Sequence, residues 1–236
     1  MNARIFSLAA VLFAVLTAAA VFLPPQVSAQ SAPNEGKLSM KPGEDGWISL
    51  FNGKDLAGWK VPNFGGEADV TVEDGIMTIG MGAMVSGIAL NQDFPFKSNF
   101  EIEVTAKRTM GSDFYAAITC PVGADGFVTF INGGWGGSVF GFSSINGFDA
   151  SENETMELLS TKANQWYTFR VKVYDDRIEG WMDDKLVTKA MREGNTFTTR
   201  FEVDYSKPVG VTNYCCETKI KSIRCREIKK ENAPER

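Results

Sequence analysis

The feature that most constrains this chain is a series of short alternating segments separated by turn residues. Between residues 99 and 108, every second side chain from Phe100 to Ala106 is apolar, and the side chains between them are polar. A period of two is typical of a strand that buries one face. Helical periodicity is hard to find, since only residues 152–159 could hold one or two helical turns. We therefore predict an all-β fold.

The alternation is clearest between residues 166 and 189. A strand over 167–173 is followed by two more, over 178–182 and 186–188, and pairs of aspartates mark the turns between them. That order predicts a three-stranded meander. Asp74-Gly75 is a strong hairpin signal between two further short strands. The remaining expected strands are 47–51, 70–72, 76–79, 84–90, 99–108, 114–120, 127–131, 200–203, 209–214 and 219–228.

About a dozen strands without alternating helices predict a sandwich or a barrel. We expect a two-sheet antiparallel β-sandwich in jelly-roll order, with a closed barrel as the alternative. The 236 residues and 44% hydrophobic content are enough for one substantial core, and the length favours a single domain. The sandwich is expected over residues 46–229, between a flexible linker over 30–45 and a disordered tail over 230–236.

Residues 1–29 have the features of a signal peptide. Arg4 supplies the positive charge, an apolar run follows, and Val27-Ser28-Ala29 has the small-x-small form of a cleavage site. The apolar run is nearly long enough to span a bilayer, so an uncleaved anchor is the alternative. We expect an exported protein, periplasmic or extracellular, with no membrane span in its mature form.

The chain contains no histidine, which limits the chemistry open to it. A Ser-His-Asp or Cys-His nucleophile is excluded, and so is the commonest ligand of transition metals. Proton transfer must use Asp, Glu, Tyr, Lys or Arg, and a metal would be a hard ion held by oxygens, such as Ca²⁺. The net charge of −5 argues against a nucleic-acid partner.

Four cysteines lie in the mature part of the chain, at positions 120, 215, 216 and 225. Their spacing does not match a zinc site. In an exported protein they could form disulfides, for which four cysteines allow three full pairings, or remain buried thiols. The sequence leaves these two alternatives open.

The segment Gly46–Trp59 reads G-W-I-S-L-F-N-G-K-D-L-A-G-W and resembles the opening of the 3-keto-disaccharide hydrolase family. That family is also described as the 3-keto-glucoside 1,2-lyase and 3-keto-2-hydroxy-glucal hydratase domain. Later segments agree with it, namely the hairpin over 74–77 and the strands that open at 99 and 166. The resemblance implies a concanavalin A-like, laminin G-like jelly roll that acts on a carbohydrate.

The chain departs from the family's pattern in the middle. Where the family often carries an Asn-Ser-Gly-Ile-like string leading to Arg, residues 111–118 read G-S-D-F-Y-A-A-I. The Gly-Trp-Gly block over 133–137 and the acidic segment over 149–154 are also unlike its typical members. The resemblance therefore supports the expected fold more strongly than it supports the expected activity.

A 3-keto-glucoside lyase needs a base for the C2 proton, a group that stabilises the enolate, and a platform for the sugar. The carboxylates that the resemblance offers as the base are Asp113, Asp149, Glu152 and Glu154. Tyr115 and Arg170 are the further candidates for proton donor or enolate partner. The acidic segment, with Asn146 and Asn153, could also hold Ca²⁺, although it lacks the EF-hand spacing.

The expected sugar platform consists of Trp135 and Trp59, because sugar rings stack their C–H faces on aromatic rings. Gly134 and Gly136 would let the backbone approach the ligand closely, and Asn146 is a further candidate contact. The alternative for Trp135 is a glycine-rich bend with the ring packed inside. The same platform would serve a non-catalytic glycan-binding or adhesion module, which is the alternative to an enzyme.

Overall fold

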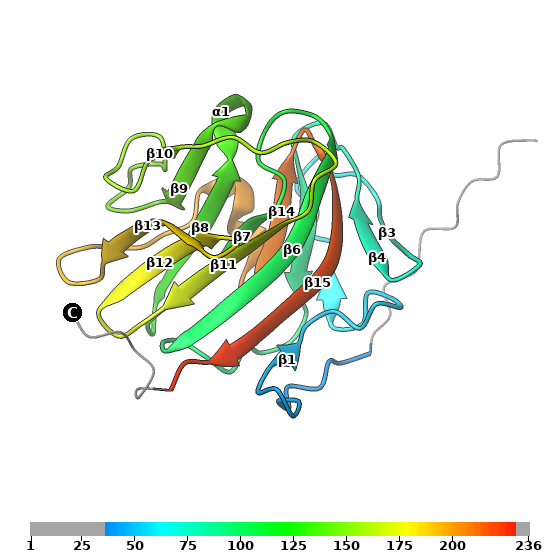
Figure 1. The fold of residues 1–236 in the computed structure, drawn as a ribbon, viewed down its shortest axis with the longest axis horizontal. Helices are drawn as coiled ribbons and strands as arrows, with labels where there is room; N and C mark the ends of the chain where they lie inside the picture. Colours follow the sequence, from blue (N-terminus) through cyan, green and yellow to red (C-terminus); the bar gives the residue numbers. More distant parts are fainter. Residues whose placement is uncertain (1–35, 230–236) are drawn as a thin grey trace, which may run out of the picture.

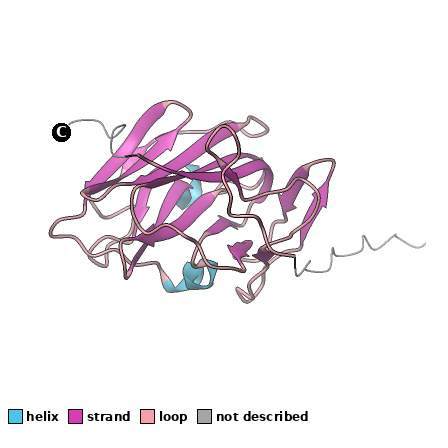
Figure 2. Cartoon of the chain, turned by 90° about the horizontal axis from the view of Figure 1, so that it is seen from below, coloured by secondary structure: helices cyan, strands magenta, loops and turns pink. Residues whose placement is uncertain are grey.

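The computed structural model describes residues 36–229, and the predictions for residues 1–29 and 230–236 lie outside this range. Two antiparallel sheets pack face to face and neither closes on itself (Figure 1). The sandwich prediction is therefore confirmed, and the closed barrel is wrong. Figure 2 shows how little of the described chain is helical.

The first sheet, sheet A, carries the meander at one edge. The prediction of three consecutive paired strands over 167–188 is confirmed by their register. In spatial order the strands of sheet A are β13 (Lys185–Met191), β12 (Arg177–Met182), β11 (Tyr167–Val173), β6 (Phe100–Met110), β15 (Glu217–Glu227), β4 (Ile76–Ile79) and β3 (Val70–Glu73), with β1 (Ile48–Ser49) paired to β15.

The second sheet, sheet B, includes three strands that the sequence did not predict. Two of them, Trp59–Lys60 and Glu157–Leu158, have two residues each and are too short to show a period of two. In the third, Val139–Ser143, a glycine and burial on both faces hide that period. In spatial order the strands of sheet B are β10 (Glu157–Leu158), β9 (Val139–Ser143), β8 (Gly126–Gly133), β7 (Ala117–Val122), β14 (Gly210–Tyr214), β5 (Val85–Leu90) and β2 (Trp59–Lys60).

The main core lies between the two sheets. On β6 the side chains of Phe100, Ile102, Val104 and Ala106 are fully buried, as the alternation predicted. Phe130 and Phe142 of sheet B point into the same core, with ring centroids 5.3 Å apart. Burial of this apolar surface is the main force that holds the sheets together.

Three strands of sheet B are buried on both of their faces. Every residue of β5, β7 and β9 is buried. Ala117, Ile131 and Val139 form a second, smaller apolar cluster on the face turned away from sheet A, with Phe114 packed against it. This outer face of sheet B is where the loops gather.

Two connecting segments differ from the prediction. Residues 200–203 were expected as a strand, but Phe201–Ser206 forms a 3₁₀ helix, η1, in which Ser206 Oγ donates to the carbonyl of Val203 at 2.5 Å. Residues 152–159 form turns and the short strand β10 in place of helical turns.

Several other features bear on the sequence predictions. In residues 36–45, part of the expected linker, the amide of Leu38 donates to Gln92 Oε1 at 2.8 Å. The four cysteines are free thiols in the structure. Within residues 36–229, no helix has the length and apolar character needed to cross a membrane.

Candidate functional site

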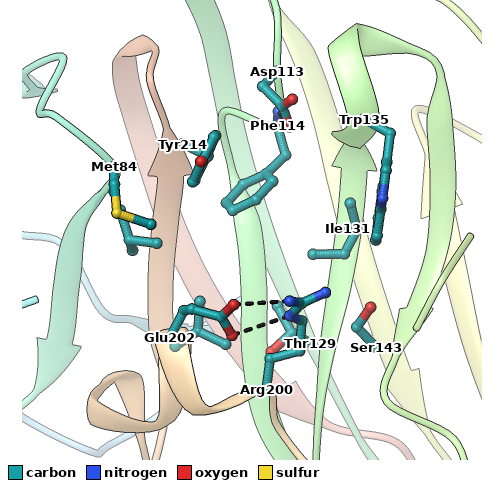
Figure 3. A pocket seen from close by; sticks show the side chains of 12 residues that line it. Met84, Asp113, Phe114, Thr129, Ile131, Trp135, Ser143, Arg200, Glu202 and Tyr214 are labelled. Atoms are coloured by element: carbon teal, nitrogen blue, oxygen red, sulfur yellow. Dashed lines mark hydrogen bonds and ion pairs between the residues drawn. The ribbon is translucent and has the colours of Figure 1, made fainter. Parts of the chain in front are cut away.

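A pocket of about 280 Å³ opens on the outer face of sheet B (Figure 3). We call it the Trp135 pocket. Its wall is mainly apolar, and its polar groups lie at two ends, with Asp113 at one end and Arg200 and Glu202 at the other. The residues that line it are Met84, Val85, Asp113, Phe114, Thr129, Ile131, Trp135, Ser143, Arg200, Glu202, Val203 and Tyr214.

Trp135 stands on the sharp connection α1 (Gly134–Gly137) between β8 and β9. Its backbone is left-handed, with φ 49°, and Gly136 after it has φ 84°, a conformation that glycine adopts without strain. A Cβ on Gly134 would lie 2.7 Å from Ile131 Cγ2, so the backbone packs directly on the pocket floor. The turn leaves the Trp135 side chain 44% exposed. An indole ring is therefore presented to solvent along one side of the pocket.

Asp113 fixes this turn from the neighbouring loop between β6 and β7. Its Oδ2 accepts a hydrogen bond from the Gly136 amide at 2.8 Å, and its Oδ1 accepts one from the Phe114 amide at 2.8 Å. No ion pair to Asp113 is found in the described part of the chain. The structure thus brings together Asp113, Trp135, Gly134 and Gly136.

At the other end of the pocket, Arg200 is held between two carboxylates. Its Nε and Nη2 donate to Glu202 at 3.1 and 2.8 Å, and its Nη1 donates to Asp149. The hydrogen bonds with Glu202 raise the pKa of Arg200, and the same bonds lower the pKa of Glu202. A guanidinium has five N–H groups, so two remain for a ligand.

Asp149 reaches this cluster from the loop between β9 and β10. Its Oδ1 accepts a hydrogen bond from Ser144 Oγ at 3.3 Å. Glu152 is exposed nearby and adds to the negative field on Arg200, while Glu154 is exposed without a hydrogen bond to the pocket. Asn146 Nδ2 donates a hydrogen bond to Asn195 Oδ1 at 2.7 Å, and Asn146 does not line the pocket.

Two aromatic candidates lie in the core, away from the pocket. Tyr115 is fully buried, its ring edge-on to Phe169, and this burial raises the pKa of its hydroxyl. Trp59 is 1% exposed, and its Nε1 donates to the carbonyl of Leu50 at 2.6 Å. Neither ring is open to a sugar, because each fills space between the sheets.

Arg170 lies on the outer face of sheet A, on the far side of the sandwich. Its Nε donates to Glu103 Oε2 at 2.6 Å, and its Nη1 pairs with Asp184 at 3.3 Å. The period of two on β11 places it opposite the buried Phe169 and Val171. It therefore cannot reach a substrate in the Trp135 pocket.

The sequence reasoning missed the cationic end of the pocket. Arg200 and Glu202 fall in a segment whose alternation predicted a strand, and the contact with Asp149 joins residues 51 positions apart. The apolar walls from Met84, Phe114 and Tyr214 also come from strand ends that look like ordinary core. The one sequence signal for this end of the pocket is the loop-like composition of the residues around η1 and Pro208.

No metal site is evident among residues 36–229. There, no group of three or more cysteine, aspartate or glutamate side chains has a geometry that could hold a metal ion. Within the acidic segment that suggested Ca²⁺, Asp149 pairs with Arg200, and Glu152 and Glu154 are exposed. A Ca²⁺ site there stays a prediction.

The sequence matches the model of a family described as the 3-keto-alpha-glucoside-1,2-lyase-like domain, over residues 46–224. Among curated proteins, none matches. A candidate glycosyl hydrolase from Parabacteroides distasonis ATCC 8503 is similar in structure, with a TM-score of 0.50, 15% identity, and coverage of 78% of this chain and 95% of that one.

Two other solved structures are also similar. The Crh5 transglycosylase in complex with NAG has a TM-score of 0.53, 14% identity, and coverage of 84% of this chain and 88% of that one. SCLam, a non-specific endo-beta-1,3(4)-glucanase from family GH16, has a TM-score of 0.52, 11% identity, and coverage of 86% and 98%. At these identities the likeness establishes the fold alone.

Proposed function

The chain belongs to the 3-keto-alpha-glucoside-1,2-lyase-like domain family, and we propose that it is a carbohydrate-active enzyme that cleaves or hydrates 3-keto-glucosides in the Trp135 pocket. The observation that carries the proposal is that three groups line one small pocket, with Asp113 at one end and Arg200 at the other. They are the exposed face of Trp135, an arginine with two N–H groups to spare, and the carboxylate of Asp113. These supply the platform, the oxyanion partner and the base that the reaction needs.

The size and charge of the pocket favour a neutral sugar ring. Its volume of about 280 Å³ is just below the range for small-molecule sites, roughly 300–1,000 Å³. Arg200 is the one cation among its lining residues, against the carboxylates of Asp113 and Glu202, and Asp149 adds a third negative charge at Arg200. An anionic ligand would therefore meet net repulsion.

The reaction we propose begins with a ring stacked on Trp135 and its C3 ketone directed at Arg200. Asp113 takes the C2 proton, and the electron pair moves into the C2–C3 bond as negative charge develops on the ketone oxygen. The N–H groups of Arg200 stabilise that charge. When the ketone re-forms, the C1–O bond breaks, and the protonated Asp113 gives its proton to the oxygen of the leaving aglycone, which restores the base. Water then adds across the C1–C2 double bond and gives the free 3-keto sugar.

Of the two carboxylates that line the pocket, we assign Asp113 as the base. Glu202 is held by two hydrogen bonds from Arg200, which lower its pKa and make it a weak base. Asp113 accepts its two hydrogen bonds from uncharged backbone amides. Glu202 and Asp149 instead hold the guanidinium of Arg200 in place.

The test is release of the aglycone from a 3-keto-glucoside, followed by NMR with Ca²⁺ or a chelator present. We expect Asp113→Asn to lower kcat by about 10²- to 10⁴-fold, the usual contribution of a general base. Asn retains one acceptor oxygen, which can bind the Gly136 amide, while the Phe114 amide loses its partner. Asp125→Asn, in the exposed turn between β7 and β8, is the matched control and keeps full activity. Equal activity of Asp113→Asn and wild type would refute the role of Asp113.

A glycan-binding module is the second candidate, and one observation favours it. The carboxylates of Asp113 and Glu202 already accept two hydrogen bonds each, as expected of groups that shape a pocket. A binding module would hold sugar without forming product, and Trp135→Ala would abolish the binding. We also propose export through residues 1–29, testable by N-terminal sequencing of the secreted protein.

A further inference from the structure

Two adjacent cysteines form the turn that joins β14 to β15, next to the Trp135 pocket. Cys216 is fully buried, and its thiol engages both backbone groups of one residue of the pocket. Its Sγ accepts a hydrogen bond from the Asp113 amide at 3.2 Å and donates one to the Asp113 carbonyl at 3.2 Å. One thiol therefore fixes the backbone of the loop that carries Asp113.

The rest of this turn is bound to the opposite wall of the pocket. The Cys215 amide donates to the Met84 carbonyl at 3.0 Å, and its thiol lies 3.4 Å from the Ala83 carbonyl. The preceding residue, Tyr214, lines the pocket and donates from its amide to the Phe114 carbonyl at 2.9 Å. Two walls of the pocket are thus connected through one short segment.

We propose that Cys216 is a positioning residue for the Trp135 pocket. It orients Asp113, the carboxylate of Asp113 holds the Gly136 amide, and that contact sets the turn that presents the indole ring of Trp135. The effect on sugar binding rests on the proposed function, whereas the effect on the turn does not. This positioning role explains why a side chain that forms hydrogen bonds lies within the apolar core.

The surroundings of Cys216 suit a thiol that stays protonated and fits closely. Burial raises its pKa, so the S–H group persists as a donor at neutral pH. A Cβ on Gly111 would lie 2.8 Å from its sulfur, so the loop packs directly against it. Alanine at this position would leave the amide and carbonyl of Asp113 without their partner.

The chain contains a matched control. Cys225 is also fully buried, and no residue between 36 and 229 forms a hydrogen bond with its thiol. Cys225→Ala removes the same sulfur from the core of the sandwich, at a position on sheet A, without affecting the loop of Asp113. A difference between Cys216→Ala and Cys225→Ala thus measures the loss of the Cys216 contacts with Asp113, not the loss of a buried sulfur atom.

The first experiment follows amide hydrogen exchange by NMR in the purified protein, without ligand. In wild type we expect the Asp113 and Gly136 amides to be protected. In Cys216→Ala we expect exchange at Gly136 to rise about fivefold, the change that loss of one weak hydrogen bond allows, while Cys225→Ala leaves it unchanged. Cys216→Ser, whose hydroxyl donates and accepts, restores most of the protection. An unprotected Asp113 amide in wild type overturns the proposal whether or not the variants fold.

The second experiment measures the affinity of the same proteins for methyl 3-keto-α-glucoside by calorimetry. We expect Cys216→Ala to bind about tenfold more weakly than wild type, and Cys216→Ser and Cys225→Ala to bind within about twofold. If Cys216→Ala retains wild-type exchange at Gly136 and wild-type affinity, Cys216 has no positioning role. If wild type itself does not bind the sugar, the proposed function fails, and the exchange result alone decides the role of Cys216.

Discussion

Replacing Arg200 by methionine separates its part in the reaction from its part in stability. The variant loses three hydrogen bonds to Glu202 and Asp149, whose side chains are 22% and 21% exposed. Because this cluster is partly solvated, and exposed ion pairs contribute about 0–1 kcal/mol each, we expect a stability loss of about 1–2 kcal/mol. Loss of the group that stabilises the enolate costs more, about 10²- to 10³-fold in kcat.

The assay compares kcat for aglycone release with the free energy of unfolding in urea. Arg170→Met is the matched control, because Arg170 also bridges two carboxylates, Glu103 and Asp184, but on the far face of the sandwich. It should lose at least as much stability, since Glu103 is only 5% exposed, and it should keep its activity. Equal losses of activity in the two variants, or full activity in Arg200→Met, would refute the assignment.

Three further predictions concern other parts of the pocket. Trp135→Ala should raise KM or Kd at least tenfold, measured by calorimetry, with a melting temperature close to that of wild type because the ring is exposed. Gly134→Ala should weaken sugar binding about tenfold, since the new Cβ displaces Ile131. Glu202 has a lowered pKa when folded, so its contribution to stability is present above about pH 4.5 and is lost as the pH falls through the folded pKa. Melting curves of Glu202→Gln between pH 3 and 7 should lack that part of the acid sensitivity.

Sheet A was largely predictable, because apolar and polar side chains alternate along its central strands. The polar Glu101 and Glu103 between Phe100 and Val104 make the period of two visible in the sequence. Sheet B was harder, because strands buried on both faces read as continuous apolar runs. Val139–Ser143 was therefore missed, although its last residue, Ser143, lines the pocket.

The candidate site was partly predictable, and the reason differs between its two ends. Glycines flank Trp135, and glycine is unfavourable in the interior of a strand. Asp113 follows Gly111 at a turn. Both residues can therefore be recognised as candidates in the sequence. Arg200 meets Asp149 only through tertiary structure. Tyr115 and Trp59 lie in the core, which the sequence did not reveal because an aromatic ring with a polar tip looks the same there whether it faces the core or a ligand.

The most direct test of the account is the reaction of a 3-keto-glucoside with the purified protein in D₂O, followed by NMR. Removal of the C2 proton, elimination of the aglycone and addition of D₂O predict a free 3-keto sugar that carries deuterium at C2. A product that keeps its C2 proton would show direct hydrolysis and contradict the elimination. Absence of any product, with the sugar bound and Trp135 perturbed, would contradict the enzyme and leave the glycan-binding module.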